Sequence, residues 1–387
     1  MMPCFPPFRF FPLFLFIFLS GALSCAVSAQ PAAAEPVLAA KSWILVEHAT
    51  GQILASNASD ARVDPASLTK LMTAYLTFAA LKAGTITESQ EVQVSAAAWK
   101  QEGSRMFIEP RTPVAVSDLI RGVIVQSGND ACVALAELLG GSEENFAVMM
   151  NREAKRLGMK NTHFMNSNGL PHPEHYSTAR DLATLASAII RDFPDHYGLY
   201  SLKSFTYNRI MQPNRNRLLY IDPTVDGMKT GQTKEAGYCL VSSALRGSRR
   251  LVSVVLGTSS DNARAQESLK LLNYGFQFHN MMRIYVADQP LSQFRVWKGA
   301  EKTVGAGFSY DFIISLPKGK TSKIEPVLES RQPVFAPLVR GQEIGTLKLT
   351  IDGDLYGSFP VVALADVPQA GFFGRTWDAI MLWFKSL

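Results

Sequence analysis

The sequence predicts an α+β fold: an antiparallel sheet flanked by helices with a helical subdomain, then a small all-β domain and a C-terminal amphipathic helix. Three observations predict it. Apolar runs of strand character come early and again around residues 238–258, helical patterns fill the space between them, and short β-rich runs follow Met282. Strands, then helices, then strands favour an antiparallel sheet covered by helices over a repeated βαβ unit.

The composition is that of a globular protein. Hydrophobic residues make up 47% and charged residues 18% of the 387 residues, which excludes a disordered chain and a long coiled coil. The formal net charge of +5 is small and scattered, so we expect no nucleic acid partner. Cys132 and Cys239 lack the spacing of a zinc site or a redox pair, and we expect no metal and no cofactor.

The N-terminus has the pattern of a secretory signal peptide. An apolar run from Phe10 to Leu19 follows Arg9 and precedes the small residues Val27-Ser28-Ala29. This pattern predicts a signal peptide over residues 1–29 that is cleaved after Ala29. An uncleaved membrane anchor is the alternative, because the apolar stretch approaches the ~18 residues that span a bilayer.

Residues 30–280 are predicted to form one mixed domain. Two apolar runs flank the turn 49–52, which predicts a hairpin, and Pro65 opens a helix that Gly84 ends. Further helices are expected at 117–126, 130–139, 142–157, 178–191 and 262–278, and strands at 204–209, 238–245 and 250–258.

A β-rich domain is predicted over residues 281–368. Short strand-like runs at 283–286, 312–315, 333–335, 347–350 and 360–362 are separated by Gly, Pro and Lys.

Residues 369–387 are predicted to form an amphipathic helix. At ~100° per residue, eight apolar side chains fall on one half of the wheel: Phe372, Phe373, Trp377, Ile380, Met381, Trp383, Phe384 and Leu387. The segment is terminal and rich in Trp and Phe, so we expect it to bind a membrane surface without spanning it. Packing against a core is the alternative.

The first candidate for chemistry is the pair Ser67 and Lys70. They lie three residues apart in the first turns of the helix after Pro65, so both side chains lie on one face. A serine becomes nucleophilic when a base takes its proton, and a buried lysine with a lowered pKa can do so. Alone, this spacing is too common to predict a function.

Two further motifs give the pair its weight. Ser127-Gly128-Asn129 lies between two predicted helices, where a tight turn can direct a second hydroxyl and an amide at the same site. Lys229-Thr230-Gly231 precedes a strand run and suits an edge strand that faces a cleft. The three motifs in this order on helix, loop and strand are specific.

With these motifs the sequence resembles the serine penicillin-recognising enzymes, which comprise β-lactamases and penicillin-binding proteins. The phrases 127–132, 214–216, 226–231 and 236–238 look like the low-molecular-mass D-alanyl-D-alanine carboxypeptidases. The resemblance covers the signal, a catalytic domain from about Ala39 to Asn280, the β-rich domain and the terminal helix. It implies a β-lactamase/transpeptidase-like fold and a periplasmic enzyme bound peripherally to the inner membrane.

The resemblance also implies catalytic roles. Ser67 would attack the carbonyl of the penultimate D-Ala, Lys70 would be its base, and Ser127 would pass a proton to the leaving amine. Asn129 and Lys229 would hold the hydrogen-bond network and the electrostatic field.

The implied binding residues lie on the third motif and near it. Thr230 and Gly231 would line the substrate site, the backbone N–H of Gln232 would complete an oxyanion hole, and Arg215 and Arg264 would bind the substrate carboxylate. Arg217 could replace Arg215 after a small shift of register. The implied partners are a peptidoglycan stem peptide that ends in D-Ala-D-Ala and β-lactam antibiotics.

Some details differ from the family pattern or stay open. Relatives often have His where this chain has Gln232, and a polar residue where it has Cys239. Ser104 would either lie on a loop over the cleft or on a surface turn.

Three other functions would be compatible with parts of this pattern. A class A β-lactamase needs a Glu-x-x-Leu-Asn phrase after the second motif, and residues 161–181 contain none. A peptidoglycan endopeptidase shares the motifs and differs in the bond that it cuts. A catalytically inert cell-wall binding protein would have no need of all three motifs.

Overall fold

The computed structural model describes residues 35–318 and 323–385. The predicted signal peptide, residues 1–29, lies outside the described residues and stays a prediction. The domain boundaries at 280 and 368 also stay predictions, although strand-only structure begins close to the first of them.

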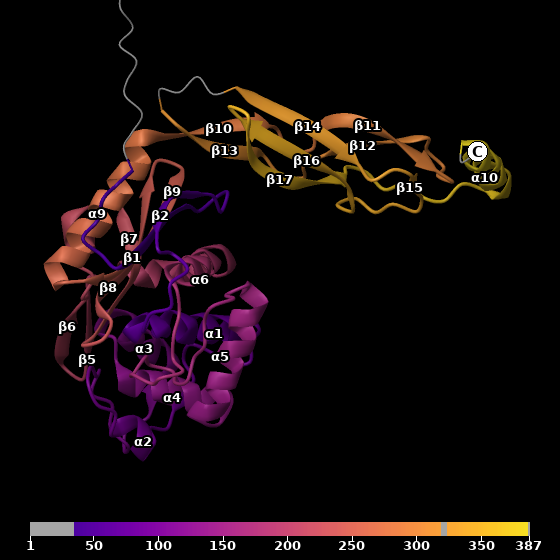
Figure 1. The fold of residues 1–387 in the computed structure, drawn as a ribbon. Coiled ribbons are helices and arrows are strands. Elements are labelled where there is room, and N and C mark those ends of the chain that lie inside the picture. Colours follow the sequence, from indigo (N-terminus) through magenta and orange to yellow (C-terminus); the bar gives the residue numbers. More distant parts are fainter. Residues whose placement is uncertain (1–34, 319–322, 386–387) are drawn as a thin grey trace, which may run out of the picture.

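The first structural unit is built on a five-stranded antiparallel sheet with the order β2-β1-β9-β8-β7 (Figure 1). Its strands are β1 (Ser42–Glu47), β2 (Ile53–Asn57), β7 (Val225–Thr233), β8 (Gly237–Arg246) and β9 (Arg249–Thr258). The predicted hairpins 43–55 and 238–258 are confirmed as β1–β2 and β8–β9. The third motif lies on β7, which is an edge strand as expected.

Helices cover both faces of this sheet because its central strands are apolar on both sides. On β1, Ile44 and Val46 join the core under α6 (Ala179–Asp192), whereas Trp43 and Leu45 join the core under α9 (Asp261–Phe278). Successive side chains of a strand point to opposite faces, so a fully buried β1 separates two cores.

The helical subdomain lies on the α6 side of the sheet (Figure 1). A 3₁₀ turn, η1 (Ala66–Thr69), leads into α1 (Lys70–Lys82). The other elements are α2 (Ala96–Trp99), α3 (Val116–Arg121), η2 (Gly122–Gln126), α4 (Asn129–Gly140), α5 (Glu143–Leu157), α7 (Pro194–Tyr197), η3 (Gly198–Ser201) and α8 (Leu218–Ile221), with the hairpins β3 (Glu91–Val92)–β4 (Val114–Ala115) and β5 (Ser204–Tyr207)–β6 (Ile210–Pro213).

The predicted helices are confirmed to within a few residues, with two differences in type. The helix predicted after Pro65 begins with the 3₁₀ turn η1. Residues 122–126 form the π-helical turn η2, which ends at Ser127 with a left-handed φ of 67°. Such turns are rare and are frequent at functional sites. Periodicity did not reveal it, because one widened turn leaves the apolar pattern of residues 117–126 unchanged.

The second unit is all-β, as predicted. In it β10 (His279–Tyr285) pairs with β13 (Phe312–Pro317), beside a six-stranded sheet of order β14-β16-β17-β12-β11-β15. The strands of that sheet are β11 (Pro290–Trp297), β12 (Thr303–Gly307), β14 (Ile324–Ser330), β15 (Val334–Phe335), β16 (Glu343–Ile351) and β17 (Asp354–Ala363). The prediction missed β11, β12 and β14, because their apolar residues are interrupted by Gly, Pro, polar or charged residues.

The C-terminal helix α10 (Phe372–Lys385) lies at the end of the β domain that is remote from the helical subdomain (Figure 1). It contacts the β domain through its polar side. Asp378 is buried, accepts a hydrogen bond from the backbone N–H of Lys298 at 2.6 Å and lies 3.6 Å from Lys302 Nζ. Its large apolar side chains stay exposed: Phe372, Phe373, Trp377, Ile380, Trp383 and Phe384. No helix within 35–318 and 323–385 is long and apolar enough to cross a membrane.

Candidate active site

Ser67 and Lys70 meet as the spacing predicts. Ser67 lies in η1, Lys70 begins α1, and Lys70 Nζ donates a hydrogen bond to Ser67 Oγ at 2.8 Å. The lysine side chain is buried. Burial lowers the pKa of Lys70 to about 8, and the positive charge of Arg215 acts in the same direction. The pair therefore has the contact and the shifted pKa that activation of a serine requires.

A backbone carbonyl completes the surroundings of this lysine. The oxygen of Asn168 accepts a second hydrogen bond from Lys70 Nζ at 2.5 Å. The next residue, Gly169, has φ +85°, and a Cβ there would lie 1.8 Å from the oxygen of Ala66. Only glycine permits this approach of the loop to the serine turn. The one signal of this loop in the sequence is an Asn-Gly turn between two predicted helices, and it was not predicted to lie at the site.

A neutral histidine supports the same turn from behind. His175 Nε2 lies 2.9 Å from Thr69 Oγ1, and His175 Nδ1 accepts a hydrogen bond from the backbone N–H of Met165 at 3.3 Å. Nε2 therefore carries the ring proton and donates it to Thr69. Burial lowers the pKa of His175 to about 4, so the ring is neutral at ordinary pH. No motif of the sequence points to His175.

The second motif directs Ser127 into the cleft and uses Asn129 for support. Ser127 lines the cleft. Asn129 is buried. Its side-chain Nδ2 donates a hydrogen bond to the backbone oxygen of Glu102 at 2.6 Å, and its backbone N–H donates one to the backbone oxygen of Ser104, also at 2.6 Å. These contacts hold the 102–104 loop at the cleft, and Ser104 lines it. Of the two alternatives for Ser104, a loop over the cleft or a surface turn, the structure shows the loop at the cleft.

Asp130, next to the second motif, fastens the chain that follows this loop. Its carboxylate accepts hydrogen bonds from the backbone N–H groups of Met106 at 3.0 Å and Phe107 at 2.8 Å. The carboxylate is buried, so these charge-assisted bonds fix the loop to the start of α4.

The third motif closes the cleft from the sheet side. Lys229 is buried and donates from Nζ to the backbone oxygen of Thr230 at 2.9 Å. Burial, and the charges of Lys70 and Arg215 after it, hold the pKa of Lys229 well below its usual range. A Cβ on Gly231 would lie 3.1 Å from the oxygen of Pro65, so glycine lets β7 approach η1.

These elements enclose a cleft of about 470 Å³. It is lined by Ser67, Ser104, Ser127, Asn214, Arg215, Arg217, Thr230, Gly231, Gln232, Tyr238, Asp261 and Arg264. Of the predicted site residues, Lys70, Asn129 and Lys229 lie behind this lining, and the other seven are part of it. The structure thus brings all ten to one place.

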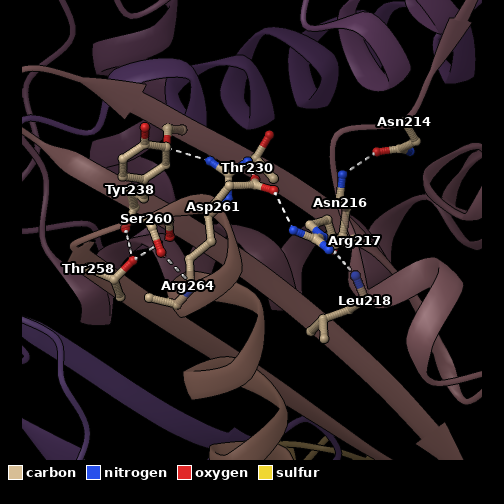
Figure 2. Close-up of polar contacts among 12 residues, drawn as sticks. Asn214, Asn216, Arg217, Leu218, Thr230, Tyr238, Thr258, Ser260, Asp261 and Arg264 are labelled. Atoms are coloured by element: carbon tan, nitrogen blue, oxygen red, sulfur yellow. Dashed lines mark hydrogen bonds and ion pairs between the residues drawn. The ribbon is translucent and has the colours of Figure 1, made fainter.

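Three arginines line the cleft together with Asp261: Arg215, Arg217 and Arg264. Figure 2 shows Asp261 beside Arg217 and Arg264. Arg264 is buried, ion-pairs with Asp261 Oδ1 and donates to the oxygen of Gly231 at 3.2 Å. Arg217 Nη1 lies 3.5 Å from Asp261 Oδ2. Within the described residues Arg215 has no hydrogen-bond or ion-pair partner. No motif of the sequence points to Asp261.

Comparison with protein families agrees with this geometry. Residues 29–260 match the family described as D-alanyl-D-alanine carboxypeptidase. The chain belongs to this family. Residues 280–369 match a second family, described as the C-terminal domain of penicillin-binding protein 5.

Individual relatives of the carboxypeptidase extend the comparison to nearly the whole chain. It is 42% identical to D-alanyl-D-alanine carboxypeptidase DacC of Escherichia coli over 96% of this chain and 95% of the relative. It is also 42% identical to DacA of Haemophilus influenzae over 96% of each chain. The crystal structure of penicillin-binding protein 5 from H. influenzae matches with a TM-score of 0.81 at 42% identity, over 87% of this chain and 100% of the other.

These findings confirm the resemblance inferred from the three motifs. The protein is a serine peptidase of the D-alanyl-D-alanine carboxypeptidase type with a transpeptidase-like domain and an all-β domain. The roles of the individual site residues stay predictions.

Proposed function

We propose that this carboxypeptidase removes the terminal D-Ala from peptidoglycan stem pentapeptides through an acyl-enzyme on Ser67. The observation that carries the proposal is the 2.8 Å contact between Lys70 Nζ and Ser67 Oγ, together with a Lys70 pKa lowered to about 8. A buried amine with this pKa is neutral in a useful fraction of molecules near neutral pH.

In the first half-reaction the C–N bond between the two D-Ala residues is exchanged for an ester. Neutral Lys70 takes the proton of Ser67, whose Oγ attacks the carbonyl carbon of the penultimate D-Ala. The backbone N–H groups of Ser67 and Gln232 stabilise the oxyanion, and Ser127 passes a proton to the leaving amine. Free D-Ala departs and the shortened peptide stays on Ser67.

In the second half-reaction water attacks the ester, and its proton returns through the same groups to Ser67 Oγ. The products are the shortened peptide and the free enzyme. Lys229 belongs to the hydrogen-bond network beside the site through its contact with the oxygen of Thr230, while Asn129 holds the 102–104 loop against the site.

The terminal carboxylate of the substrate is proposed to bind Thr230 and the arginines that line the cleft. Thr230 and Arg215 line the cleft, and the guanidinium of Arg215 is unpaired within the described residues. A free guanidinium suits a planar carboxylate with two acceptor oxygens.

We also propose that β-lactams acylate Ser67. The similar Listeria monocytogenes penicillin-binding protein D2, 29% identical with a TM-score of 0.58, has been crystallised in an ampicillin-bound form. A strained cyclic amide that carries a carboxylate fits the same cleft chemistry as the peptide.

The protein is further proposed to act in the periplasm as a peripheral protein of the inner membrane. The signal-like pattern of residues 1–29 supports export. The exposed apolar side of α10, with two Trp and three Phe, supports binding to a lipid surface.

The decisive experiment is mass spectrometry of a pentapeptide stem after incubation with the purified protein. We expect loss of one alanine with the parent protein and with Ser358→Ala, an exposed serine of β17. Ser67→Ala should fold, release nothing and form no adduct with penicillin. A penicillin adduct on Ser67→Ala would refute the nucleophile.

A second substrate separates the carboxypeptidase from the endopeptidase alternative. A cross-linked dimeric stem should be cleaved far more slowly than the pentapeptide. Preferential cleavage of the cross-link would favour the endopeptidase.

A further inference from the structure

Asp261 is an unexpected neighbour for a carboxylate-binding site. It is an acidic side chain that lines a cleft whose other charged lining residues are arginines. Both of its oxygens are engaged: Oδ1 by Arg264 and Oδ2 by Arg217 (Figure 2). A substrate that carries a terminal carboxylate meets the same guanidinium groups and is repelled by this one negative charge.

The position of Asp261 is built into the fold. Ser260 caps α9, because its side chain accepts a hydrogen bond from the backbone N–H of Ala263 at 3.1 Å, and Asp261 is the first residue of the helix. A negative charge in the first turn is stabilised by the helix N-terminus. Arg264 follows three residues later on the same face, so the pair lies within one helical turn.

The two arginines differ in what they can give to a substrate. Arg264 is buried and donates a hydrogen bond to the backbone oxygen of Gly231. Its other terminal nitrogen forms the ion pair with Asp261, which offsets its positive charge. Arg217 is half-exposed and its ion pair is long at 3.5 Å, so it can turn to a ligand. Arg215 is free within the described residues.

We propose that Asp261 is a specificity-determining residue that competes with the terminal carboxylate of the substrate for Arg217 and Arg264. The proposal rests on the function proposed above. An internal carboxylate of this kind weakens substrate and transition state alike, so its effect falls mainly on KM. It leaves Arg215 and Thr230 as the principal carboxylate contacts.

The test is Asp261→Asn, which keeps the shape of the side chain and removes its charge. The substrate is an N-blocked peptide that ends in D-Ala-D-Ala, and its C-terminal amide serves as an uncharged analogue whose inhibition constant is measured. Asp60→Asn is the matched control, because Asp60 pairs with Arg180 outside the cleft.

We expect Asp261→Asn to lower KM for the carboxylate peptide roughly two- to fivefold, the range of a partly exposed ion pair, and to change kcat less than KM. The inhibition constant of the amide should be the same for Asp261→Asn and the parent protein. Asp60→Asn should have the KM and kcat of the parent protein.

Two results would overturn the proposal: a KM that is unchanged or higher, or an equal shift for peptide and amide. A rise in KM would mean that Asp261 positions Arg264 for the substrate. Failure of the parent protein itself to release D-Ala would contradict the proposed function instead, and this outcome is visible before any variant is compared. Equal thermal midpoints for parent and Asp261→Asn would show that the fold is kept.

Discussion

The carboxamide of Gln52 exchanges two hydrogen bonds with the backbone of Ser315: Nε2 donates to the carbonyl at 2.9 Å, and Oε1 accepts from the N–H at 2.8 Å. Gln52 belongs to the β1–β2 turn and Ser315 to β13, whose described strand partner is β10. The side chain thus occupies the free edge of β13 as a neighbouring strand would. It ties the catalytic unit to the β domain.

Gln52→Ala should loosen this junction. Two neutral hydrogen bonds contribute together about 1–3 kcal/mol, so the two units should sample more orientations. Small-angle X-ray scattering should show a broader distribution of interatomic distances, while turnover of soluble peptide stays near that of the parent. Gln266→Ala, at an exposed position of α9, is the control. Arg249 also donates a hydrogen bond to the carbonyl of His279 in β10 at 2.7 Å, so the two units stay joined in the variant. Identical scattering curves for the two variants would contradict the role of Gln52.

Acylation should depend on pH through Lys70. Its pKa is lowered to about 8, and only the neutral amine accepts the proton of Ser67. The second-order rate of acylation by a penicillin should therefore rise about tenfold per pH unit below 8 and level off above it.

The pKa of Lys229 is lowered too, so a control is needed. Lys229→Arg keeps a fixed positive charge on β7. Its acylation rate should be lower than that of the parent protein at every pH but should still rise with pH below 8. Lys70 would be excluded as the titrating base if the acylation rate of the parent protein did not change from pH 6 to 9, or if the rise with pH were lost in Lys229→Arg.

Gly169→Ala should damage the site through the backbone. The added Cβ would lie 1.8 Å from the oxygen of Ala66, at a φ of +85° that costs a non-glycine residue about 1–3 kcal/mol. The loop must move, and Lys70 loses the carbonyl of Asn168. We expect acylation to slow at least tenfold and the thermal midpoint to fall by several degrees.

Gly158→Ala is the control that distinguishes the backbone strain of a positive φ from the steric clash of the added Cβ. Gly158 has φ +81°, but nothing lies within 4 Å of its Cβ position. It should lose stability and keep its acylation rate. Equal acylation rates for the two alanine variants would show that the Asn168 loop is not needed in this position.

Membrane binding should depend on the exposed side of α10. Removal of residues 371–387 should abolish co-sedimentation with anionic phospholipid vesicles, while activity on soluble peptide is kept. Phe373→Ser should weaken partitioning roughly tenfold, because burial of a Phe side chain is worth about 1.5–3 kcal/mol. Thr376→Ser, on the same exposed helix, should change nothing. Full vesicle binding by the truncated chain would disprove the anchor.

The three motifs were recognisable because each is a short local phrase, and only their order together with the family resemblance predicted one shared site. Ser67 and Lys70 share one helical turn, and Lys229-Thr230-Gly231 stands beside a strand pattern, so both phrases can be read from residue type and spacing. The groups that adjust them were not predictable. Asn168 acts through a backbone oxygen, His175 through one hydrogen bond to Thr69, and Asp261 through arginines three and 44 residues away.

By itself, the sequence determined the kind of fold and the candidates for the reacting side chains, because helical and strand periodicity and motif spacing are properties of neighbours along the chain. Only the tertiary structure decided the pKa of Lys70, the partner of each arginine, and which side of α10 meets solvent. These depend on burial and on charges brought together from distant segments, and no local pattern encodes a distance across a fold.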